Sequence, residues 1–321
     1  MLPGRREKST RSHSTILFLQ PEKATQKHQK IWLASKNVPR LPVQLTAMQY
    51  DLAVAYRIYP KVSKTPPVFA TDKLQLSNLC LRSFRRGIAG LKVKLFALLD
   101  GCPSQYEEIF RQSFGQRDLQ LINLPSVGNR PTFGHQINLL TAQSDAELVY
   151  FAEDDYFYRP GAIAEMSSFL RANADADFVT PYDHPDGYQL PLHPRSQEIR
   201  PWGTRHWRTA ASTCLTFLTS KSTLQRTASV FRTYQRTNLD VSLWMALTKQ
   251  TVLNPFALFR CLRRSVRFAG YIAQSWRYKP LQILLGKKWK LWCPLPSLAT
   301  HMEVPFLAPC VNWMEAFERY D

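Results

Sequence analysis

The chain has 321 residues, of which 45% are apolar and 12% aromatic, and its formal net charge is +18. This length and apolar content suit one large α/β domain or two small ones and exclude an intrinsically disordered protein. The charge is uneven: residues 1–47 carry nine Lys/Arg and two acids, and residues 254–292 carry nine Lys/Arg and no acid. A nucleic-acid binder more typically carries its cations on the folded body beside base-stacking aromatics. The observed distribution therefore fits binding to an anionic membrane surface at least as well as binding to nucleic acid.

Residues 1–47 are polar, basic and without apolar periodicity, so we predict that they are mostly disordered. Their short apolar run, Ile16–Leu19, is too short for a signal peptide, and no stretch of the chain reaches the length of a transmembrane helix without a charge. Periodic sequence begins at Met48, which is a second candidate for the true start. The six cysteines are scattered, as is typical of reduced thiols. We therefore expect a cytoplasmic protein, peripheral on the inner face of the membrane.

From Met48 onward, strand patterns alternate with helix patterns. The predicted strands are 50–56, 91–99, 119–124, 148–152, 177–181 and 210–219, and the predicted helices are 72–86, 106–114, 132–142, 160–173 and 240–248. Strands and helices alternating at this spacing predict an α/β fold with a mostly parallel, Rossmann-like sheet and covering helices. Residues 182–209 are loop-like, and the segment 294–320 ends in an amphipathic helix.

Three consecutive acids, Glu153, Asp154 and Asp155, follow the apolar strand 148–152. Carboxylates are costly beside a core unless a cation compensates them. Mg²⁺ is often held by one or two carboxylates together with substrate phosphates, so the cluster predicts a site for a metal–diphosphate and a nucleotide or nucleotide-sugar substrate. The alternative is an acidic turn that caps the helix starting near Pro160.

Two other predicted strands also end in polar residues, since Arg57 follows the first strand and Asp100 ends the second. Ligands of such sheets sit beyond the carboxyl ends of the strands, so we expect Arg57, Asp100 and the three acids to converge on a bound donor. As alternatives, Arg57 would only pair with an acid, and Asp100 would only be a turn residue before Gly101.

In this order, the features resemble a glycosyltransferase of the GT-A fold, close to the family 2-like group. The matching segments are the Leu-Gln-Leu-Ser-Asn-Leu-Cys-Leu-Arg-Ser-Phe helix at 74–84, the strand ending at Asp100, the Gly128-Asn129 turn, the DxD-like Phe151-Ala-Glu-Asp-Asp-Tyr156 segment, and Pro296-Ser-Leu-Ala-Thr-His301. The resemblance covers about residues 48–253 and 293–315. It implies a GT-A domain at 48–253 and 293–321, interrupted by a basic amphipathic insertion at 254–292.

The resemblance implies a metal-dependent transferase of polysaccharide biosynthesis, with Mn²⁺ or Mg²⁺ as cofactor, that moves a sugar from a nucleoside-diphosphate sugar to a saccharide or lipid-linked acceptor. By position, Asp155 would be the main metal ligand, and His301 would bind the metal or the diphosphate. Glu153 and Asp154 would contact the ribose or support the metal, and Asp100 would contact the nucleoside. His301 could otherwise be an ordinary surface histidine.

Asp240, in Asn-Leu-Asp-Val-Ser-Leu-Trp, falls where the inverting members of the family place their general base. The family often has two acids there, whereas Asp240 stands alone. Its alternative role is the N-cap of the helix 240–248. The aromatic–basic cluster Trp202, His206 and Trp207 is a candidate acceptor site because aromatic faces suit sugar rings, although such residues also pack loops.

The segment 255–292 combines apolar residues at helical spacing with arginines, and tryptophans follow amid lysines. The apolar residues are Phe256, Phe259, Leu262 and Val266, and the tryptophans are Trp276, Trp289 and Trp292. This combination predicts an interfacial helix on an anionic membrane, and the alternative is a solvated helical hairpin packed on the body.

Two other functions compete with sugar transfer. A nucleotidyltransferase would also use a metal and a nucleotide, but it would usually show a glycine-rich basic loop after the first strand, and residues 57–64 are basic without glycine. A non-catalytic basic binding protein on a transferase fold would explain the net charge but not the acid cluster. We expect no nucleic-acid partner.

Overall fold

The computed structural model describes residues 48–62, 65–190, 192–193 and 197–319. Residue contacts divide the chain into Met1–Ala47 and Met48–Asp321. The predicted disorder of residues 1–47 therefore concerns a segment outside the described residues.

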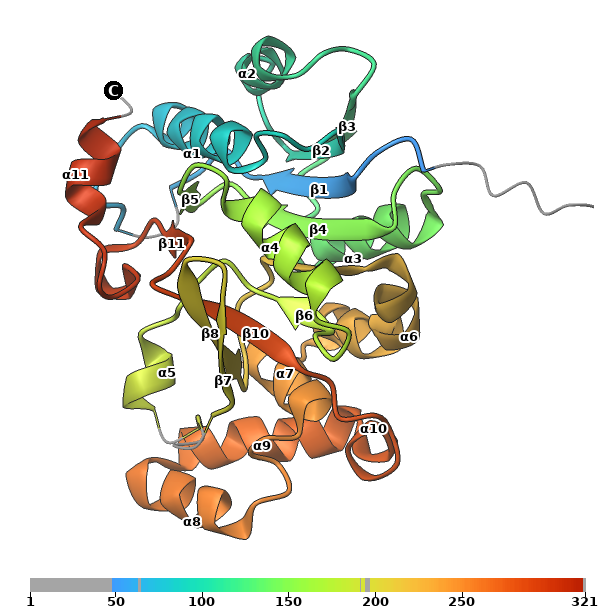
Figure 1. Cartoon of the computed structure of the whole chain (residues 1–321), viewed down its shortest axis with the longest axis vertical. Helices are drawn as coiled ribbons and strands as arrows, with labels where there is room; N and C mark the ends of the chain where they lie inside the picture. Colours follow the sequence, from blue (N-terminus) through green and yellow to red (C-terminus); the bar gives the residue numbers. More distant parts are fainter. Residues whose placement is uncertain (1–47, 63–64, 191, 194–196, 320–321) are drawn as a thin grey trace, which may run out of the picture. The chain divides into compact units, whose positions relative to one another are not determined.

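The strands form one large sheet and one small sheet (Figure 1). Within the described residues, the large sheet has nine strands in the order β3-β2-β1-β4-β9-β6-β10-β8-β7. Its strands are β1 (Leu52–Ile58), β2 (Val93–Asp100), β3 (Leu119–Leu124), β4 (Leu148–Glu153), β6 (Phe178–Val179), β7 (Ile199–Trp202), β8 (Arg205–Ala210), β9 (Phe217–Ser220) and β10 (Leu291–Leu295). The small antiparallel sheet pairs β5 (Tyr156–Tyr158) with β11 (Ala299–His301).

Most strands of the large sheet run in the same direction. β3, β2, β1 and β4 are mutually parallel, β9 runs antiparallel between β4 and β6, and β10 is parallel to β6. β8 and then β7 extend this edge as antiparallel neighbours. The predicted class, α/β with a large, mostly parallel sheet and covering helices, is therefore confirmed.

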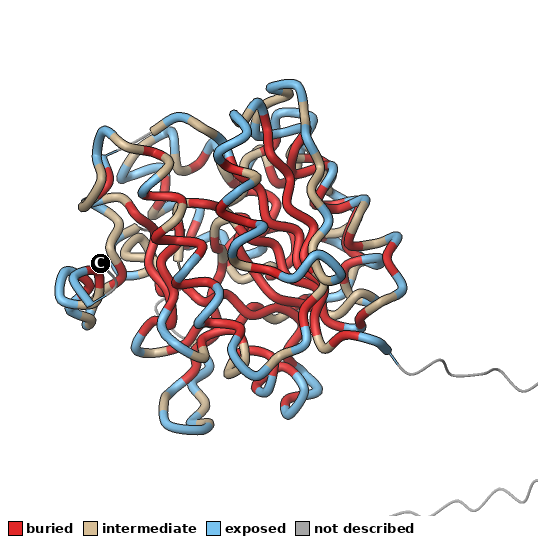
Figure 2. The backbone as a smooth tube through the Cα atoms, turned by 90° about the horizontal axis from the view of Figure 1, so that it is seen from above, coloured by how far each residue is buried: buried red, intermediate tan, exposed pale blue. Residues whose placement is uncertain are grey.

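Helices cover both faces of the sheet because the strand residues alternate between two apolar cores. Along β1, Leu52, Val54 and Tyr56 join one core, whereas Ala53 and Ala55 join the other. The first core takes side chains from α1 (Lys73–Gly87), α2 (Gln105–Ser113), α4 (Ala162–Ala172) and α11 (Trp313–Glu318). The second takes them from α3 (Asn129–Ala142), α6 (Lys221–Phe231), α7 (Asp240–Thr248), α8 (Pro255–Arg264), α9 (Val266–Tyr278) and α10 (Pro280–Leu284). In Figure 2 the buried residues gather in the middle of the tube and the exposed ones in the outer turns.

The structure corrects the prediction of a loop at 182–209. This segment contains the short helix α5 (Asp186–Gln189) and a hairpin of β7 and β8, which turns at Gly203 with a φ of 61°. The hairpin extends the sheet at an edge, where its outer strand alternates exposed and half-buried residues and so gives a weak apolar pattern. The predicted strand 210–219 is also wrong in its bounds, since β8 ends at Ala210 and β9 begins at Phe217.

The basic segment 254–292 forms α8, α9 and α10 and packs on the body of the protein. Cys261, Ile272 and Ile283, one from each helix, belong to the second core. Two short 3₁₀ helices, η1 (Arg232–Arg236) and η2 (Val304–Phe306), complete the elements. Across the described ranges, no helix is both long and apolar enough to cross a membrane. No disulfide links the six cysteines, which all lie within those ranges.

Candidate functional site

The ends of β1, β2 and β4 meet at one edge of the large sheet and border a cavity of about 390 Å³, which we call the carboxylate cavity. Its lining residues are Arg57, Ile58, Tyr59, Asp100, Ser126, Gly128, Asn129, Thr132, Glu153, Asp154 and Asp155. The structure thus brings together all the residues that were predicted to converge at the carboxyl ends of the strands. The volume lies in the range of small-molecule sites.

Arg57 and Glu153 are direct partners across β1 and β4, and their side chains form an ion pair. The Arg57 guanidinium also donates to the side-chain oxygen of Asn129 and, at 3.1 Å, to its backbone oxygen. The second oxygen of Glu153 accepts a hydrogen bond from Thr216 Oγ1 at 2.8 Å. Burial is the largest single effect on the pKa of Arg57 and lowers it, but the charge and hydrogen bond of Glu153, together with smaller effects of nearby groups, raise the pKa overall. Arg57 therefore pairs with an acid, as the alternative interpretation predicted.

Asp154 is buried and is compensated by a lysine that the sequence interpretation missed. Lys73 Nζ lies 2.8 Å from Asp154 Oδ2, which also accepts a hydrogen bond from the backbone N–H of Tyr59 at 3.1 Å. Burial raises the pKa of Asp154, and the opposing effect of Lys73 does not cancel it. Burial lowers the pKa of Lys73, but the charges of Asp154 and Asp155 outweigh this and raise it overall. Lys73 is therefore a charged, buried partner of the acid cluster.

Asp100 organises the turn that leads into α3. Its two carboxylate oxygens accept hydrogen bonds from the backbone N–H groups of Val127 and Gly128, at 2.7 and 2.8 Å. The next residue, Gly101, has a φ of 68°, and a Cβ there would lie 1.9 Å from Ser126 Oγ. Asp100 thus lines the cavity while its carboxylate is engaged by the protein, which agrees with the turn role more than with a nucleoside contact.

Asp155 and His301 meet at the junction of the two sheets. β5 begins one residue after Asp155, and His301 is the cross-strand partner of Tyr156 on β11. The distance from His301 Nε2 to Asp155 Oδ2 is 3.2 Å, and the distance from His301 Nδ1 to Glu303 Oε2 is 3.6 Å. Asp155 thus places a carboxylate beside an imidazole, and both groups can bind divalent metals in proteins.

The Asp155–His301 pair fits a metal that is shared with a ligand. Two ligand atoms at about 2.1 Å from an octahedral ion lie about 3 Å apart at a right angle, close to the spacing of this pair. Glu303 lies on the other side of the ring, where metal-binding histidines commonly have a carboxylate partner. Among the described residues, no group of three or more His, Cys, Asp or Glu could hold an ion. The pair therefore fits an ion that completes its shell with phosphate oxygens and water, and does not fit a protein-only metal centre.

The N-terminus of α3 opens onto the same cavity, where Gly128, Asn129 and Thr132 line the wall. Its first turn contains no acidic residue, and the anion nearest its N-cap in the described contacts is Asp100, which binds the N–H of Gly128. Gln136 fixes the helix to the sheet by donating to the backbone oxygens of Ala55 and Ala152, at 2.7 and 3.1 Å. The start of α3 is therefore fixed next to the carboxylates, an arrangement that suits a phosphate group bound together with a cation.

Asp240 lines a second cavity of about 520 Å³, which we call the Asp240 cavity. Leu239 occupies the N-cap of α7 without a side-chain cap bond, and Asp240 is the first helical residue. The alternative of an N-cap role for Asp240 is therefore wrong; its Oδ1 accepts a hydrogen bond from the backbone N–H of Val241 at 2.7 Å. His193 lines the same cavity, and burial, with smaller effects of nearby cations, lowers its pKa to about 4. His193 is thus neutral near pH 7.

The two cavities are neighbours. Cys214 lines the Asp240 cavity, and two residues later Thr216 binds Glu153 of the carboxylate cavity. Tyr234 provides a second link, since its hydroxyl accepts a hydrogen bond from Asn129 Nδ2 at 3.2 Å. Burial is the largest cause of the raised pKa of Tyr234, and its pKa also responds to the charges of Arg57, Asp240 and Glu153. Tyr234 therefore lies within electrostatic reach of both cavities.

The predicted acceptor cluster does not form part of either cavity. Trp207 is fully buried and stacks on Phe169 with a ring-centroid distance of 4.0 Å, so neither face of its ring is open to a sugar. Trp202 packs edge-on against Phe169 at 5.6 Å, and His206 is exposed on β8. The prediction of Trp207 as an acceptor residue is wrong, and core packing explains both tryptophans.

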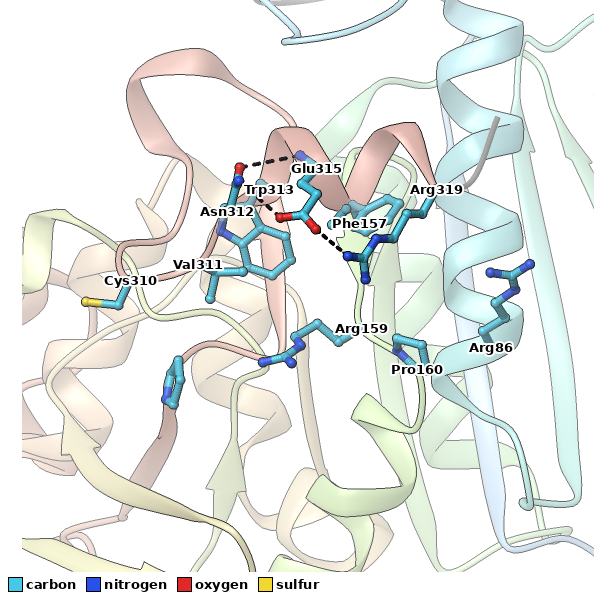
Figure 3. Close-up of a pocket in the computed structure, with 12 residues that line it drawn as sticks. Arg86, Phe157, Arg159, Pro160, Cys310, Val311, Asn312, Trp313, Glu315 and Arg319 are labelled. Carbon is cyan, nitrogen blue, oxygen red and sulfur yellow. Dashed lines mark hydrogen bonds and ion pairs between the residues drawn. The ribbon is translucent and has the colours of Figure 1, made fainter.

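A further cavity, of about 480 Å³, lies between α11 and the turn after β5 (Figure 3). Three arginines, Arg86, Arg159 and Arg319, line it, and Glu315 pairs with Arg319. Figure 3 shows Arg159 across the cavity from the Asn312–Glu315–Arg319 contacts. No predicted site residue lines this cavity, so it is separate from the carboxylate cavity.

Sequence reasoning missed several residues that build the site, chiefly Lys73, Thr216 and Tyr234. Lys73 left a usable signal, because a lysine in the first turn of a helix opposes the helix dipole and needs a compensating anion. The sequence around Thr216 and Tyr234 contains no comparable signal, because these two residues reach the site only through the three-dimensional arrangement of the chain.

Comparisons with known proteins give no family. No family model matches the chain, and no curated protein matches it. The crystal structure of S. aureus TarS, residues 1–349, is similar over 71% of this chain and 72% of that chain, with 13% identity and a TM-score of 0.39. A 4-diphosphocytidyl-2C-methyl-D-erythritol synthase from Anaerococcus prevotii is similar over 61% and 81%, with 11% identity and a TM-score of 0.36. At these values neither similarity is informative about the chemistry, so the function is inferred from the geometry of the site.

Proposed function

We propose that the protein is a metal-dependent glycosyltransferase that moves a sugar from a nucleoside-diphosphate donor to a saccharide or lipid-linked acceptor. The observation that carries the proposal is the Asp155–His301 pair in a setting with two neighbouring cavities. The first cavity combines carboxylates with a helix start, which suits a metal–diphosphate. The second cavity contains another carboxylate, Asp240, and offers a separate place for an acceptor.

The donor would occupy the carboxylate cavity. Its diphosphate would lie between the start of α3 and the Asp155–His301 pair, which would hold Mn²⁺ or Mg²⁺. When bound, the ion would stabilise the negative charge that the leaving diphosphate gains. Tyr59 lines the cavity and is 40% exposed, so its ring would be available for a nucleobase to stack on.

The remaining predicted donor residues would act indirectly. Glu153 and Asp154 each bind a buried cation, Arg57 and Lys73, and Asp100 binds backbone amides. These contacts support a role in shaping the cavity and setting its charge, in place of the ribose and nucleoside contacts that the family resemblance implies.

In the proposed reaction, the bond between the anomeric carbon and the diphosphate oxygen breaks, and a bond from the acceptor oxygen forms. The nucleoside diphosphate leaves with the electron pair of the broken bond, and the acceptor proton passes to the Asp240 carboxylate. Because Asp240 lines the neighbouring cavity and not the donor cavity, we assign the acceptor to the Asp240 cavity. Attack from that side, opposite the leaving group, would invert the anomeric centre.

A thermal-shift screen of nucleoside diphosphates and their sugars, each with and without Mn²⁺, tests the donor site. We expect a rise in melting temperature that needs nucleotide and Mn²⁺ together, because a ligand that binds only the folded state stabilises it. Asp155→Asn should remove the Mn²⁺-dependent part, whereas Glu318→Gln, on an exposed acid of α11, should not. A folded Asp155→Asn protein with the wild-type Mn²⁺-dependent shift would overturn the metal assignment.

Product analysis separates the competing functions. Sugar transfer releases a nucleoside diphosphate, whereas a nucleotidyltransferase releases inorganic diphosphate and transfers the nucleotide. A non-catalytic basic protein predicts a third result, which is no nucleotide-dependent shift but DNA binding that weakens steeply with salt.

A further inference from the structure

Helix α8 turns its small side chains inward and its large apolar side chains outward. Ala257 and Cys261, one helical turn apart, are its buried residues, and α8 packs on α9. The outer face of α8 consists of Phe256, Leu258, Phe259 and Leu262, which are all exposed. Phe256 is 78% exposed and Phe259 is 58% exposed. An amphipathic helix that meets only water and its own protein turns its large apolar residues toward the core, so this orientation needs a partner outside the described residues.

The orientation belongs to a well-formed helix. The side chain of Asn254 accepts hydrogen bonds from the backbone N–H groups of Phe256 and Ala257, at 3.0 and 3.2 Å, and Pro255 occupies the first turn. Ser265 ends α8 and caps α9 by accepting from the N–H of Arg267 at 3.2 Å. The Asn254 cap stabilises the start of α8, and the burial of Ala257 and Cys261 sets which side of the helix faces inward, so the outer face is a defined surface.

Arginines lie on and beside the outer face. At about 100° per residue, Arg263 falls between Phe256 and Phe259 on the outer face, and Arg260 falls on its flank next to Phe256. The Arg263 guanidinium lies 5.7 Å from the centre of the Phe259 ring. The segment 254–292 contains nine Lys/Arg and no acid. An apolar face with a purely basic border complements a surface that is both apolar and anionic.

The tryptophans of this segment do not contribute to the surface, which corrects the sequence interpretation. Trp289 and Trp292 are buried, and Trp276 is half-buried and donates its Nε1–H to the backbone oxygen of Val252 at 3.3 Å. Phenylalanines and leucines of α8, and not these tryptophans, form the exposed apolar surface.

We propose that the outer face of α8 docks on an anionic membrane surface, with the helix lying in the plane of the lipid headgroups. Figure 1 shows α8 at the lower edge of the part of the chain that the structure describes, with α9 between α8 and α7. Docking removes the exposed phenylalanines from water, and lipid phosphates neutralise the arginines. This inference does not depend on the proposed sugar transfer.

A second copy of the chain fits this face less well. In a two-fold pair, each patch meets the same patch of its partner, so the Arg263 side chains of the two copies would face each other. The segment 254–292 has no acid that could compensate them, and like charges brought together oppose the association. The charge pattern therefore favours a lipid surface over self-association.

Vesicle co-sedimentation of the full-length protein tests the proposal, with phosphatidylcholine alone and with about 30% phosphatidylserine added. We expect binding to the anionic vesicles only, weakened by salt. Phe256→Ser with Phe259→Ser should raise the lipid concentration for half-binding by at least about tenfold. The matched control, Ile199→Ser with Val304→Ser, changes residues that are 62% and 53% exposed elsewhere and should bind as the wild type does.

The central arginine is tested in the same way. A cation near an anionic surface contributes about a fivefold change in affinity, so Arg263→Gln should weaken binding about fivefold. Arg82→Gln, on an exposed arginine elsewhere, is the matched control. Equal binding to neutral vesicles, no binding, or binding that survives the phenylalanine substitutions would each overturn the proposal. So would a dimer in light scattering that the phenylalanine substitutions dissociate without any vesicle binding by the wild type.

Discussion

Replacing Lys73 by methionine should destabilise the protein strongly at neutral pH and much less in mild acid. Methionine keeps most of the apolar stem of lysine but removes the ammonium group that lies 2.8 Å from Asp154. Both side chains are buried, with exposures of 9% and 12%, so the pair is not screened by water as a surface ion pair is. Among the described residues, the substitution leaves this buried carboxylate with the Tyr59 N–H as its remaining hydrogen-bond donor.

The size of the stability loss depends on whether the unpaired Asp154 carboxylate stays charged or binds a proton. Removing one partner of a buried ion pair costs about 3–5 kcal/mol. Asp154 can avoid this cost by binding a proton. For an unfolded-state pKa of about 3.9, protonation costs about 4 kcal/mol at pH 7 and about 1.5 kcal/mol at pH 5. The loss in Lys73→Met should therefore be about 3–4 kcal/mol at pH 7 and about 1.5 kcal/mol at pH 5.

The sign is consistent with the pKa of Asp154. Burial already raises this pKa in the wild type, and loss of Lys73 raises it further. The folded variant then binds more protons than its unfolded state above pH 4, so its stability rises relative to the wild type as pH falls. Urea unfolding at the two pH values measures this difference, and Lys61→Met, on an exposed lysine after β1, is the control. A loss below 1 kcal/mol at pH 7, or the same loss at both pH values, would refute a buried Lys73–Asp154 pair.

Three further predictions follow from the site. Asp240→Asn should leave nucleotide binding intact and slow transfer by about 10²–10⁴, because an amide cannot take the acceptor proton; near-normal turnover would end its role as the base. Tyr59→Ala should weaken nucleoside-diphosphate binding in calorimetry by about tenfold if the base stacks on its ring, and unchanged affinity would place the base elsewhere. Gly101→Ala should cost about 1–3 kcal/mol in urea unfolding, because a φ of 68° is strained for alanine and its Cβ would meet Ser126. Gly90→Ala, at a φ of 85° with open space around its Cβ, should cost only the dihedral part, and equal losses at both glycines would remove the contact with Ser126 as a cause.

The first half of the fold could be predicted from sequence because its signals are local. β1, β2 and β4 are buried on both faces and therefore read as continuous apolar runs, and the helices between them carry apolar residues at helical spacing. The β7–β8 hairpin could not be predicted in this way. Its position depends on contacts distant in sequence, such as Arg200 with Asp175, and on pairing of β8 with β10.

The candidate site, like the fold, could be predicted from the sequence only in part. Acids at strand ends are visible in the sequence, because the carboxyl ends of parallel strands share an edge. Which acid is compensated by which cation is not visible, since Lys73 reaches Asp154 and Arg57 reaches Glu153 only once α1 and β4 are in place. Trp207 shows most clearly what the sequence does not predict. The same ring can stack on a sugar or on Phe169, and only tertiary packing decides between the two.

Helix α9 connects the proposed membrane contact with the proposed acceptor site. Its residues Arg267, Phe268 and Tyr271 line the Asp240 cavity, while α8 packs against the same helix. Hydrogen bonds fix α9 to α7: Ser242 Oγ donates to the Tyr271 backbone oxygen at 3.0 Å, and Ser275 Oγ donates to the Ser242 backbone oxygen at 2.9 Å. A helix with its side chains is about 10 Å across, so docking through α8 would hold the Asp240 cavity close to the lipid surface. Of the two acceptor classes in the proposed function, a lipid-linked acceptor meets this geometry directly, because its anchor would already lie where α8 binds.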